Sequence, residues 1–301
     1  MAFDLKDRIA GRFRTLMSSA PELGDKQASV LAIASNKGGV GKTTTSVALA
    51  IALARSGAKT LLIDLDPQAH VSASLRAQPN GQLADVLLGK MRDVCEATYP
   101  SAWPNLDLAG SEKSLAETDA MIAAKIGKEL LLAGALAIAR TRYDAILIDC
   151  PPNLGTLTLN ALCAADFLLV PTDMSVLALE GVGDILSVVE TLRTRLHRNI
   201  EVCGIVATRF DKRTTQLNTA IETSFEDLYG NAAAILETRI PQSSAVNKAH
   251  LAGEPLVDHA PSSPAAKAYT LLAHEVACRI GLGRFLGEPI AETDAHTARV
   301  G

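Results

Sequence analysis

The stretch of sequence that decides the fold is SNKGGVGKTT, at residues 35–44. An apolar run at residues 30–34 leads into it, and a helical pattern at residues 46–55 leads out. A strand, a glycine-rich turn and a helix in that order are the context that a phosphate-binding loop requires. Glycines let successive backbone N–H groups point inward, and the N-terminus of the following helix adds positive potential. The stretch therefore predicts a nucleotide-binding loop.

Two residues of this loop have predicted roles at the phosphates. Lys42 is expected to reach the β- and γ-phosphates, and the Thr43 hydroxyl to bind Mg²⁺. The loop departs from the usual G-x-x-x-x-G-K-[ST] pattern, because Asn36 replaces the first glycine and a second lysine, Lys37, follows it. A basic turn without a ligand is the alternative interpretation, and the flanking strand and helix argue against it.

Composition restricts the class of protein. The chain has 301 residues, of which 48% are hydrophobic, and a net charge of −4. It can bury a substantial core, and it is not a wholly basic nucleic-acid binder, although a local basic patch stays open. Its five cysteines lack paired spacing, which is typical of free thiols in a reducing cytosol. Because no secretory signal or membrane-length apolar run is recognisable, we expect a cytoplasmic protein and no membrane partner.

Apolar strands alternate with helical patterns from residue 30 onward. Strands are expected at residues 30–34, 60–65, 106–109, 143–149, 167–170, 200–207 and 235–238. Helices are expected at residues 46–55, 81–89, 114–125, 128–141, 176–198, 214–228, 243–251 and 264–280. This alternation predicts an α/β fold in three layers, a mostly parallel twisted sheet with helices on both faces.

The predicted organisation is one domain with a segment on each side. Residues 29–284 are expected to form the domain that contains this loop, residues 1–28 a partly helical N-terminal extension, and residues 285–301 a polar tail. In the extension, apolar residues recur at loosely helical spacing with basic residues between them. Such a segment could dock on a protein partner, a membrane or DNA, or fold back on its own domain, and the sequence leaves these alternatives open.

Two later strands end in acids. Asp64 and Asp66 end the strand at residues 60–65, and Asp149 ends the strand at residues 143–149. Ligands of parallel sheets bind beyond the carboxyl ends of the strands, so Asp149 is expected to hold Mg²⁺. Asp66 is expected to orient the attacking water or to bind the metal through water. Because phosphoryl transfer needs mainly positioning and charge neutralisation, these acids and the loop predict a Mg²⁺–ATP site.

Three segments together resemble the ParA/Soj partition ATPases, in the deviant Walker-A class that includes MinD. They are KGGVGKTT at residues 37–44, DLDPQ at 64–68 and DCPP at 149–152, with further matches at 154–166 and 178–181. The resemblance covers about residues 28–280. It implies a P-loop NTPase fold that binds ATP and Mg²⁺, a homodimer around two nucleotides, and non-specific DNA binding by that dimer. A ParB-like partner is then expected to stimulate slow hydrolysis, and the protein to be associated with the nucleoid.

The resemblance also assigns roles to single residues. The position of Lys37 reaches the partner subunit's phosphates, Asp66 is linked to hydrolysis, and Asp149 is the Walker-B acid. The catalytic residues are thus Lys37, Lys42 and Asp66, and the metal residues are Thr43, Asp66 and Asp149. Contacts to ATP are expected from Lys37, Gly38, Gly39, Val40, Gly41, Lys42, Thr43, Thr44, Thr208 and Pro241. The adenine is expected to be recognised by the segment from Thr208 to Asp211 and by Pro241.

DNA contacts are predicted from three basic residues. Arg213 matches a family arginine that contributes to DNA binding, because phosphates need only positive charge at the right place. Residues 240–245 carry Gln and Ala where relatives often have arginines. Lys248 and Lys267 lie nearby and are expected to replace them, although each lysine alone could be an ordinary solvated charge.

Two other uses of the same fold stay open. One is the positioning of a protein cargo on the nucleoid instead of plasmid or chromosome DNA. The other is a membrane-associated switch like MinD. Residues 281–301 contain two close glycines, Pro289 and scattered acids, which argue against a C-terminal membrane helix.

Overall fold

Eight strands form one sheet in the described part of the chain. The computed structural model describes residues 27–78, 82–211 and 213–286. The strands are β1 (Ser29–Ile33), β2 (Thr60–Asp64), β3 (Tyr99–Pro100), β4 (Leu106–Ala109), β5 (Ala145–Asp149), β6 (Phe167–Asp173), β7 (Glu201–Phe210) and β8 (Ile235–Pro241). Their order is β3-β4-β2-β5-β1-β6-β7-β8, and only the pair β3–β4 is antiparallel. The predicted mostly parallel sheet is confirmed.

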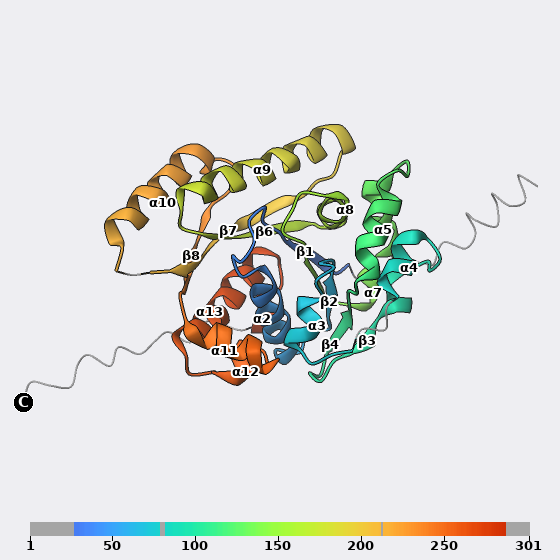
Figure 1. Cartoon of the computed structure of the whole chain (residues 1–301), viewed down its shortest axis with the longest axis horizontal. Coiled ribbons are helices and arrows are strands. Elements are labelled where there is room, and N and C mark those ends of the chain that lie inside the picture. The colour runs from blue at the N-terminus through green and yellow to red at the C-terminus, as the bar shows by residue number, and fades with distance from the viewer. Residues whose placement is uncertain (1–26, 79–81, 212, 287–301) are drawn as a thin grey trace, which may run out of the picture.

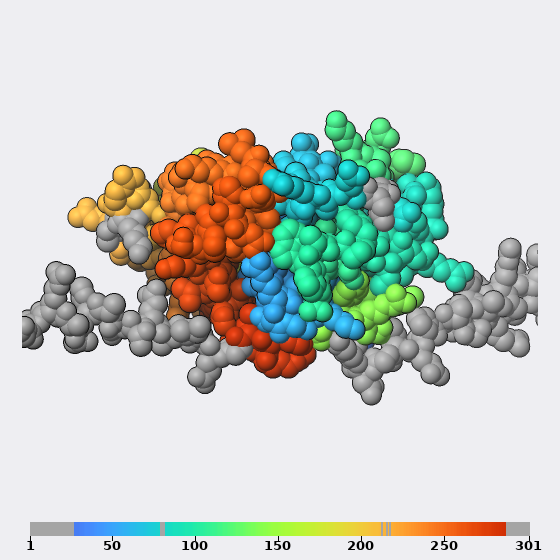
Figure 2. Space-filling view, turned by 90° about the horizontal axis from the view of Figure 1, so that it is seen from below, coloured from blue at the N-terminus to red at the C-terminus, as the bar shows by residue number. Residues whose placement is uncertain are grey.

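Helices cover both faces of this sheet (Figure 1). One layer holds α2 (Lys42–Arg55), α3 (His70–Ser74), α11 (Ser244–Ala252), α12 (Leu256–His259) and α13 (Pro264–Arg279). The other holds α4 (Leu83–Leu88), α5 (Ser114–Ile122), α6 (Leu131–Ala135), α7 (Ala139–Arg142), α8 (Thr156–Ala164), α9 (Val176–Leu196) and α10 (Thr215–Tyr229). Short elements are η1 (Val94–Ala97), η2 (Lys128–Leu130) and α14 (Gly283–Leu286). Figure 2 shows the face that α11–α13 cover, beside the blue atoms near the N-terminus of the domain.

The central strands are buried from both sides, which explains their continuous apolar runs. In β1, Val30 and Ala32 pack in the layer of α8 and α9. Leu31 and Ile33 pack in the layer of α2 and α13. Successive side chains of a strand point to opposite faces, so both faces of β1 need apolar residues.

Three strands extend farther toward the loop than the apolar pattern predicts. β6 continues to Asp173, β7 to Phe210 and β8 to Pro241. The added residues are still paired, with Asp173 opposite Thr208 and Phe210 opposite Pro241. The prediction ended these strands early because polar residues interrupt the apolar runs. Their extra length matters, since it carries polar side chains to the edge of the sheet where the loop lies.

The predicted helix at residues 128–141 is wrong, because the chain there forms η2, α6 and α7 separately. Asn160 of α8 accounts for the break between η2 and α6. Its Nδ2 donates to the Lys128 carbonyl at 2.6 Å, and its Oδ1 accepts from the Leu132 N–H at 3.1 Å. A side chain from another helix thus satisfies backbone groups that a continuous helix would pair internally.

Four α-helices were not predicted: α3, α8, α12 and α14. The cap of α8, Gly155, has no side chain to accept from the first N–H groups. Asp119 of α5 lies beside this end of the helix instead, and its interactions with Leu157 and Thr156 act to lower the pKa of its carboxyl group, against the effect of burial. A partner supplied from elsewhere in the chain leaves no local sequence signal. In the same way α2 begins at Lys42, four residues before the predicted start, because the loop runs directly into it.

The predicted N-terminal extension and polar tail lie almost wholly outside the described residues, so they stay predictions. The division at residues 29–284 also stays a prediction. Among the described residues, no helix combines the length and the apolar character needed to cross a bilayer.

The start of β1 depends on one carboxylate, which gives a prediction for stability. Asp166 accepts from the Val30 N–H at 2.9 Å and from both terminal nitrogens of Arg140 at 2.9 Å. Asp166→Ala leaves a backbone donor and a half-buried cation without their partner. We expect unfolding free energy to fall by about 1–3 kcal/mol, measured by urea unfolding.

The matched control is Asp85→Ala, which removes an exposed carboxylate bonded to Lys90 at 2.7 Å. Exposed ion pairs contribute less than about 1 kcal/mol. Equal destabilisation by both variants would contradict the role given to Asp166.

Candidate functional site

The loop between β1 and α2 curls back on itself at two glycines. Gly39 and Gly41 have φ angles of +74° and +83°, in the left-handed region. A side chain at either position would be strained, and a Cβ at Gly41 would lie 3.4 Å from the Tyr269 hydroxyl. Gly41 is followed at once by Lys42, the first residue of the 14-residue helix α2. The loop therefore presents its N–H groups and a helix N-terminus together, as an anion site requires.

Lys42 lies inside the curve of this loop. Its side chain is buried, and its Nζ donates to the Lys37 carbonyl at 3.0 Å. Burial lowers the pKa of Lys42, and the nearby Asp149 and Asp66 carboxylates oppose that shift. A buried ammonium held by a carbonyl can gain from an anionic ligand, because charge pairing offsets desolvation.

Asp149 meets the start of α2. The Thr43 hydroxyl donates to its Oδ2 at 2.7 Å, and the Ser46 hydroxyl to its Oδ1 at 2.9 Å. Complete burial raises the pKa of Asp149 to about 6, although both hydroxyl contacts act to lower it. The structure thus brings together Thr43 and Asp149, as predicted. Ser46 was missed, although its position three residues after Thr43 puts it on the same face of α2.

Asp64 and Asp66 have different environments. Asp64 is fully buried and accepts from the N–H groups of Asp66 at 2.9 Å and Val71 at 3.2 Å. Burial and the neighbouring Asp149 raise its pKa well above the usual range. Its role is to shape the turn after β2. Asp66 is also buried but has a free oxygen, since its Oδ1 accepts from the Gln68 N–H at 3.0 Å and its Oδ2 lies 4.0 Å from His70.

These residues fit a magnesium–nucleotide ligand. A threonine hydroxyl and carboxylates are the oxygen ligands that Mg²⁺ takes in nucleotide sites. Asp64, Asp66 and Asp149 are close enough that each acts on the pKa of a neighbour. Added positive charge would relieve that crowding, since like charges disfavour ionisation. Thr43, Asp66 and Asp149 would hold the metal, which would neutralise charge on the phosphates.

Lys37 has a cis partner that the sequence did not predict. Its Nζ donates to both oxygens of Asp173, at 2.8 and 2.7 Å, and to the Ser175 hydroxyl at 3.2 Å. Asn36, the residue before it, donates to Asp184 of α9 at 3.0 Å. The two residues that depart from the ordinary loop pattern are therefore both tied to the β6–α9 segment.

A cleft of about 480 Å³ lies beside the loop. It is lined by Gly39, Val40, Gly41, Thr44, Thr208, Arg209, Ile240, Pro241, Gln242, Ser243, Ser244, Val246, Asn247 and Tyr269. Both residues predicted to contact adenine, Thr208 and Pro241, line this cleft. The Thr208 hydroxyl is buried, however, and donates to the Val40 carbonyl at 2.8 Å. Thr208 therefore holds the loop in place.

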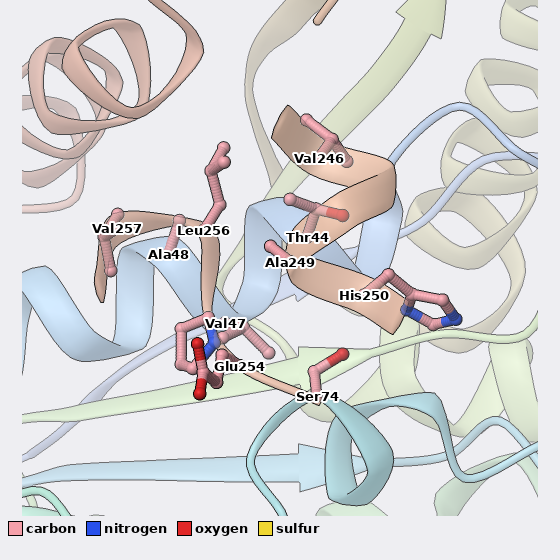
Figure 3. A pocket seen from close by; sticks show the side chains of 11 residues that line it. Thr44, Val47, Ala48, Ser74, Val246, Ala249, His250, Glu254, Leu256 and Val257 are labelled. Carbon is pink, nitrogen blue, oxygen red and sulfur yellow. The ribbon is translucent and has the colours of Figure 1, made fainter. Parts of the chain in front are cut away.

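A second cavity, between α2 and α11, is much smaller (Figure 3). Thr44 and Val246 line both this small cavity and the larger cleft. Its volume is about 20 Å³, enough for roughly one water molecule. Of these two cavities, the larger cleft is therefore the candidate nucleotide-binding site.

The three predicted DNA residues come from different elements. Lys248 and Lys267 are exposed on α11 and α13, in one helix layer. Arg213 is exposed before α10, which belongs to the other layer, and its Nη2 donates to Asp211 at 2.8 Å. That pairing lowers the pKa of Asp211 to about 2. The structure brings two of these charges to one layer and gives the third an acidic neighbour.

Comparison with known proteins identifies the family. The family described as an AAA domain matches residues 28–202. The chain is 34% identical over 254 residues to the sporulation initiation inhibitor protein Soj of Bacillus subtilis, covering 82% of this chain and 98% of that protein. The chain belongs to the ParA/Soj family of P-loop ATPases. It is also 35% identical over 255 residues to the chromosome partitioning protein ParA of Caulobacter vibrioides, covering 83% and 94% of the two chains.

Solved structures share the fold and give a nucleotide precedent. One from Mycobacterium smegmatis, described as a cobyrinic acid a,c-diamide synthase, contains ADP and magnesium. It is 32% identical, has a TM-score of 0.69, and the alignment covers 82% of this chain and 92% of that one. The same protein is also known with an ATP analogue and magnesium.

The buried position of Lys42 gives a prediction for binding. Lys42→Ala removes the ammonium from the curve of the loop but leaves the glycines and α2. Charged hydrogen bonds contribute about 1.5–3 kcal/mol each, so we expect ATP affinity to fall by about a hundredfold or more. Calorimetric titration with Mg²⁺–ATP measures this, and unchanged affinity would refute the loop assignment.

Proposed function

We propose that this protein is an ATP-dependent dimerisation switch that binds DNA without sequence preference and drives partition of plasmid or chromosome DNA. A ParB-like partner stimulates its slow ATP hydrolysis and so releases it from DNA. It acts in the cytoplasm on the nucleoid. The observation that carries the proposal is the loop at residues 35–44, with Lys42, Thr43 and Asp149 in contact range and a second lysine at its start.

The site contains the parts that hydrolysis of a phosphoanhydride needs. Lys42 and the loop N–H groups bind the phosphates, and Thr43 and Asp149 hold Mg²⁺, which neutralises their charge. Asp66 faces the same ammonium and has one oxygen not used by the turn. It can orient a water toward the γ-phosphate, which is the remaining requirement of this chemistry.

Lys37 supports the dimer part of the proposal. In the single chain its ammonium already has three contacts, on Asp173 and Ser175. We assign it no role at the phosphates of its own subunit. In the proposed dimer the Lys37 ammonium binds the phosphates of the nucleotide on the other subunit, which replace Asp173 as its anionic ligand.

The position of Asp66 predicts a separation of binding from hydrolysis. Asp66→Ala keeps the loop, Thr43 and Asp149, so ATP affinity should stay within about twofold. Loss of a water-orienting carboxylate costs about 10²–10⁴ in rate, and the ATP-bound dimer should accumulate. Phosphate release and size-exclusion light scattering measure the two effects, and wild-type turnover would refute the role.

Lys37 predicts a defect in dimerisation rather than in nucleotide binding. Lys37→Ala should leave the ATP affinity of the monomer nearly unchanged and weaken the ATP-dependent dimer about tenfold or more. Asp173→Ala is the matched variant, because it removes the cis partner and keeps the lysine. It should dimerise at least as well as wild type, measured by sedimentation. A normal dimer from Lys37→Ala would count against the trans role.

DNA binding is tested directly by a mobility shift with and without ATP across a salt series. Phosphate contacts release counterions, so affinity should fall steeply with salt and appear only with ATP. Lys248→Ala together with Lys267→Ala should reduce the salt slope by about two, whereas Arg213→Ala should have a smaller effect because Asp211 already neutralises it. Absence of any ATP-dependent, salt-sensitive binding would favour a protein cargo or a MinD-like membrane partner.

A further inference from the structure

One charged side chain lies on the wall of the nucleotide cleft and has no role in the mechanism above. Among the residues that line the cleft in the described part of the chain, Arg209 alone is charged. The other lining residues are apolar side chains, glycines, and neutral amide and hydroxyl side chains. A single cation on such a wall either binds an anionic ligand or is an ordinary solvated charge. The other contacts of its side chain distinguish these two possibilities.

The guanidinium of Arg209 is nearly free. Within the described residues its one hydrogen bond is from Nη1 to the Gly39 carbonyl, at a long 3.5 Å, and it has no ion pair. A guanidinium offers five N–H donors in a fixed fork, so most of its donors remain available. Arg213, four residues later, is the contrast, because Asp211 occupies both its Nε and its Nη2. Arg209 is thus kept free of acids although an acid lies two residues away.

The backbone holds Arg209 in this position at a cost. Its φ of +53° lies in the left-handed region, which a residue with a Cβ rarely adopts. The strain falls where the β7–β8 register shifts, between Ala207 and Phe210. Strained residues persist where the surrounding structure fixes them, and they cluster at binding sites. Here the strained residue is one whose side chain contacts the Gly39 carbonyl of the loop.

Thr208 and Arg209 act on neighbouring carbonyls of the loop. The Thr208 hydroxyl donates to Val40 at 2.8 Å and the guanidinium to Gly39 at 3.5 Å. A Cβ built at Gly39 would lie 3.9 Å from Nη1. The guanidinium is therefore at the loop end of the cleft, beside the phosphate-binding backbone, and not at the end formed by residues 240–247.

We propose that Arg209 is a nucleotide-binding residue that contacts the phosphate chain of the nucleotide from the wall of the cleft beside Gly39. The proposal rests on the nucleotide-binding function proposed above and adds a second cation to it. Lys42 binds from inside the loop as a point charge, whereas Arg209 offers a planar fork from outside. The resulting contact recognises phosphate and is indifferent to the base.

The test compares Arg209→Ala, Arg209→Lys and Arg209→Gly, titrated calorimetrically with Mg²⁺–ATP, ADP and adenosine. We expect Arg209→Ala to weaken ATP and ADP about tenfold and adenosine by less than twofold, and Arg209→Lys to recover most of the loss. Arg209→Gly should match Arg209→Ala in binding and unfold at the same or a higher temperature, because glycine tolerates the positive φ. Arg195→Ala, an exposed arginine in the last turn of α9, is the control for lost charge.

Each other outcome overturns the proposal. Equal weakening of adenosine would mean that the guanidinium stacks on the base. Wild-type affinity for ATP in all three variants would mean that Arg209 is only solvated. Failure of the wild-type protein to bind ATP, or full binding by Lys42→Ala, would instead refute the proposed nucleotide function itself, so the two failures are distinguishable.

Discussion

The parallel pairing of β1 with β5, and of β5 with β2, is the constraint on which the nucleotide site depends. The register sets Ile33 opposite Asp149, and Asp149 opposite Asp64. Because parallel strands end at the same edge, the loop after β1 and both acids emerge side by side. The shared edge of the sheet is enough to bring Asp66 near the loop, without a direct contact between the two. The register of these buried strands therefore decides which polar groups meet at this edge.

The crowding of charge at this edge gives the site its function. Asp64, Asp66 and Asp149 are buried, and burial raises the pKa of Asp64 and Asp149. One ammonium, Lys42, lies among them with a lowered pKa. Such a cluster is costly by itself, and the proposed divalent cation with its anionic nucleotide would balance its charges. The second lysine, Lys37, is held by Asp173 instead, and in the proposed dimer it would act on the other subunit.

Much of this site could be predicted from the sequence because its parts are local. A strand followed by glycines, lysine and threonine, and aspartates at strand ends, are patterns of adjacent residues. What could not be predicted depends on residues far apart in the chain. Asp173 holds Lys37 from 136 positions away, and Thr208 holds Val40 from 168. The interaction of Asp119 with the start of α8 and the contacts of Asn160 with residues 128–132 likewise join residues far apart in the chain. The fold class needed only periodicity, whereas the helix boundaries needed the tertiary contacts.

The central claim is that Lys37 changes partner when ATP binds. A crystal structure of the protein with a non-hydrolysable ATP analogue and Mg²⁺ tests it most directly. The account predicts a dimer in which the Lys37 ammonium has left Asp173 and lies on the phosphates bound to the partner subunit. A nucleotide-bound chain in which Lys37 still donates to both oxygens of Asp173 would contradict it.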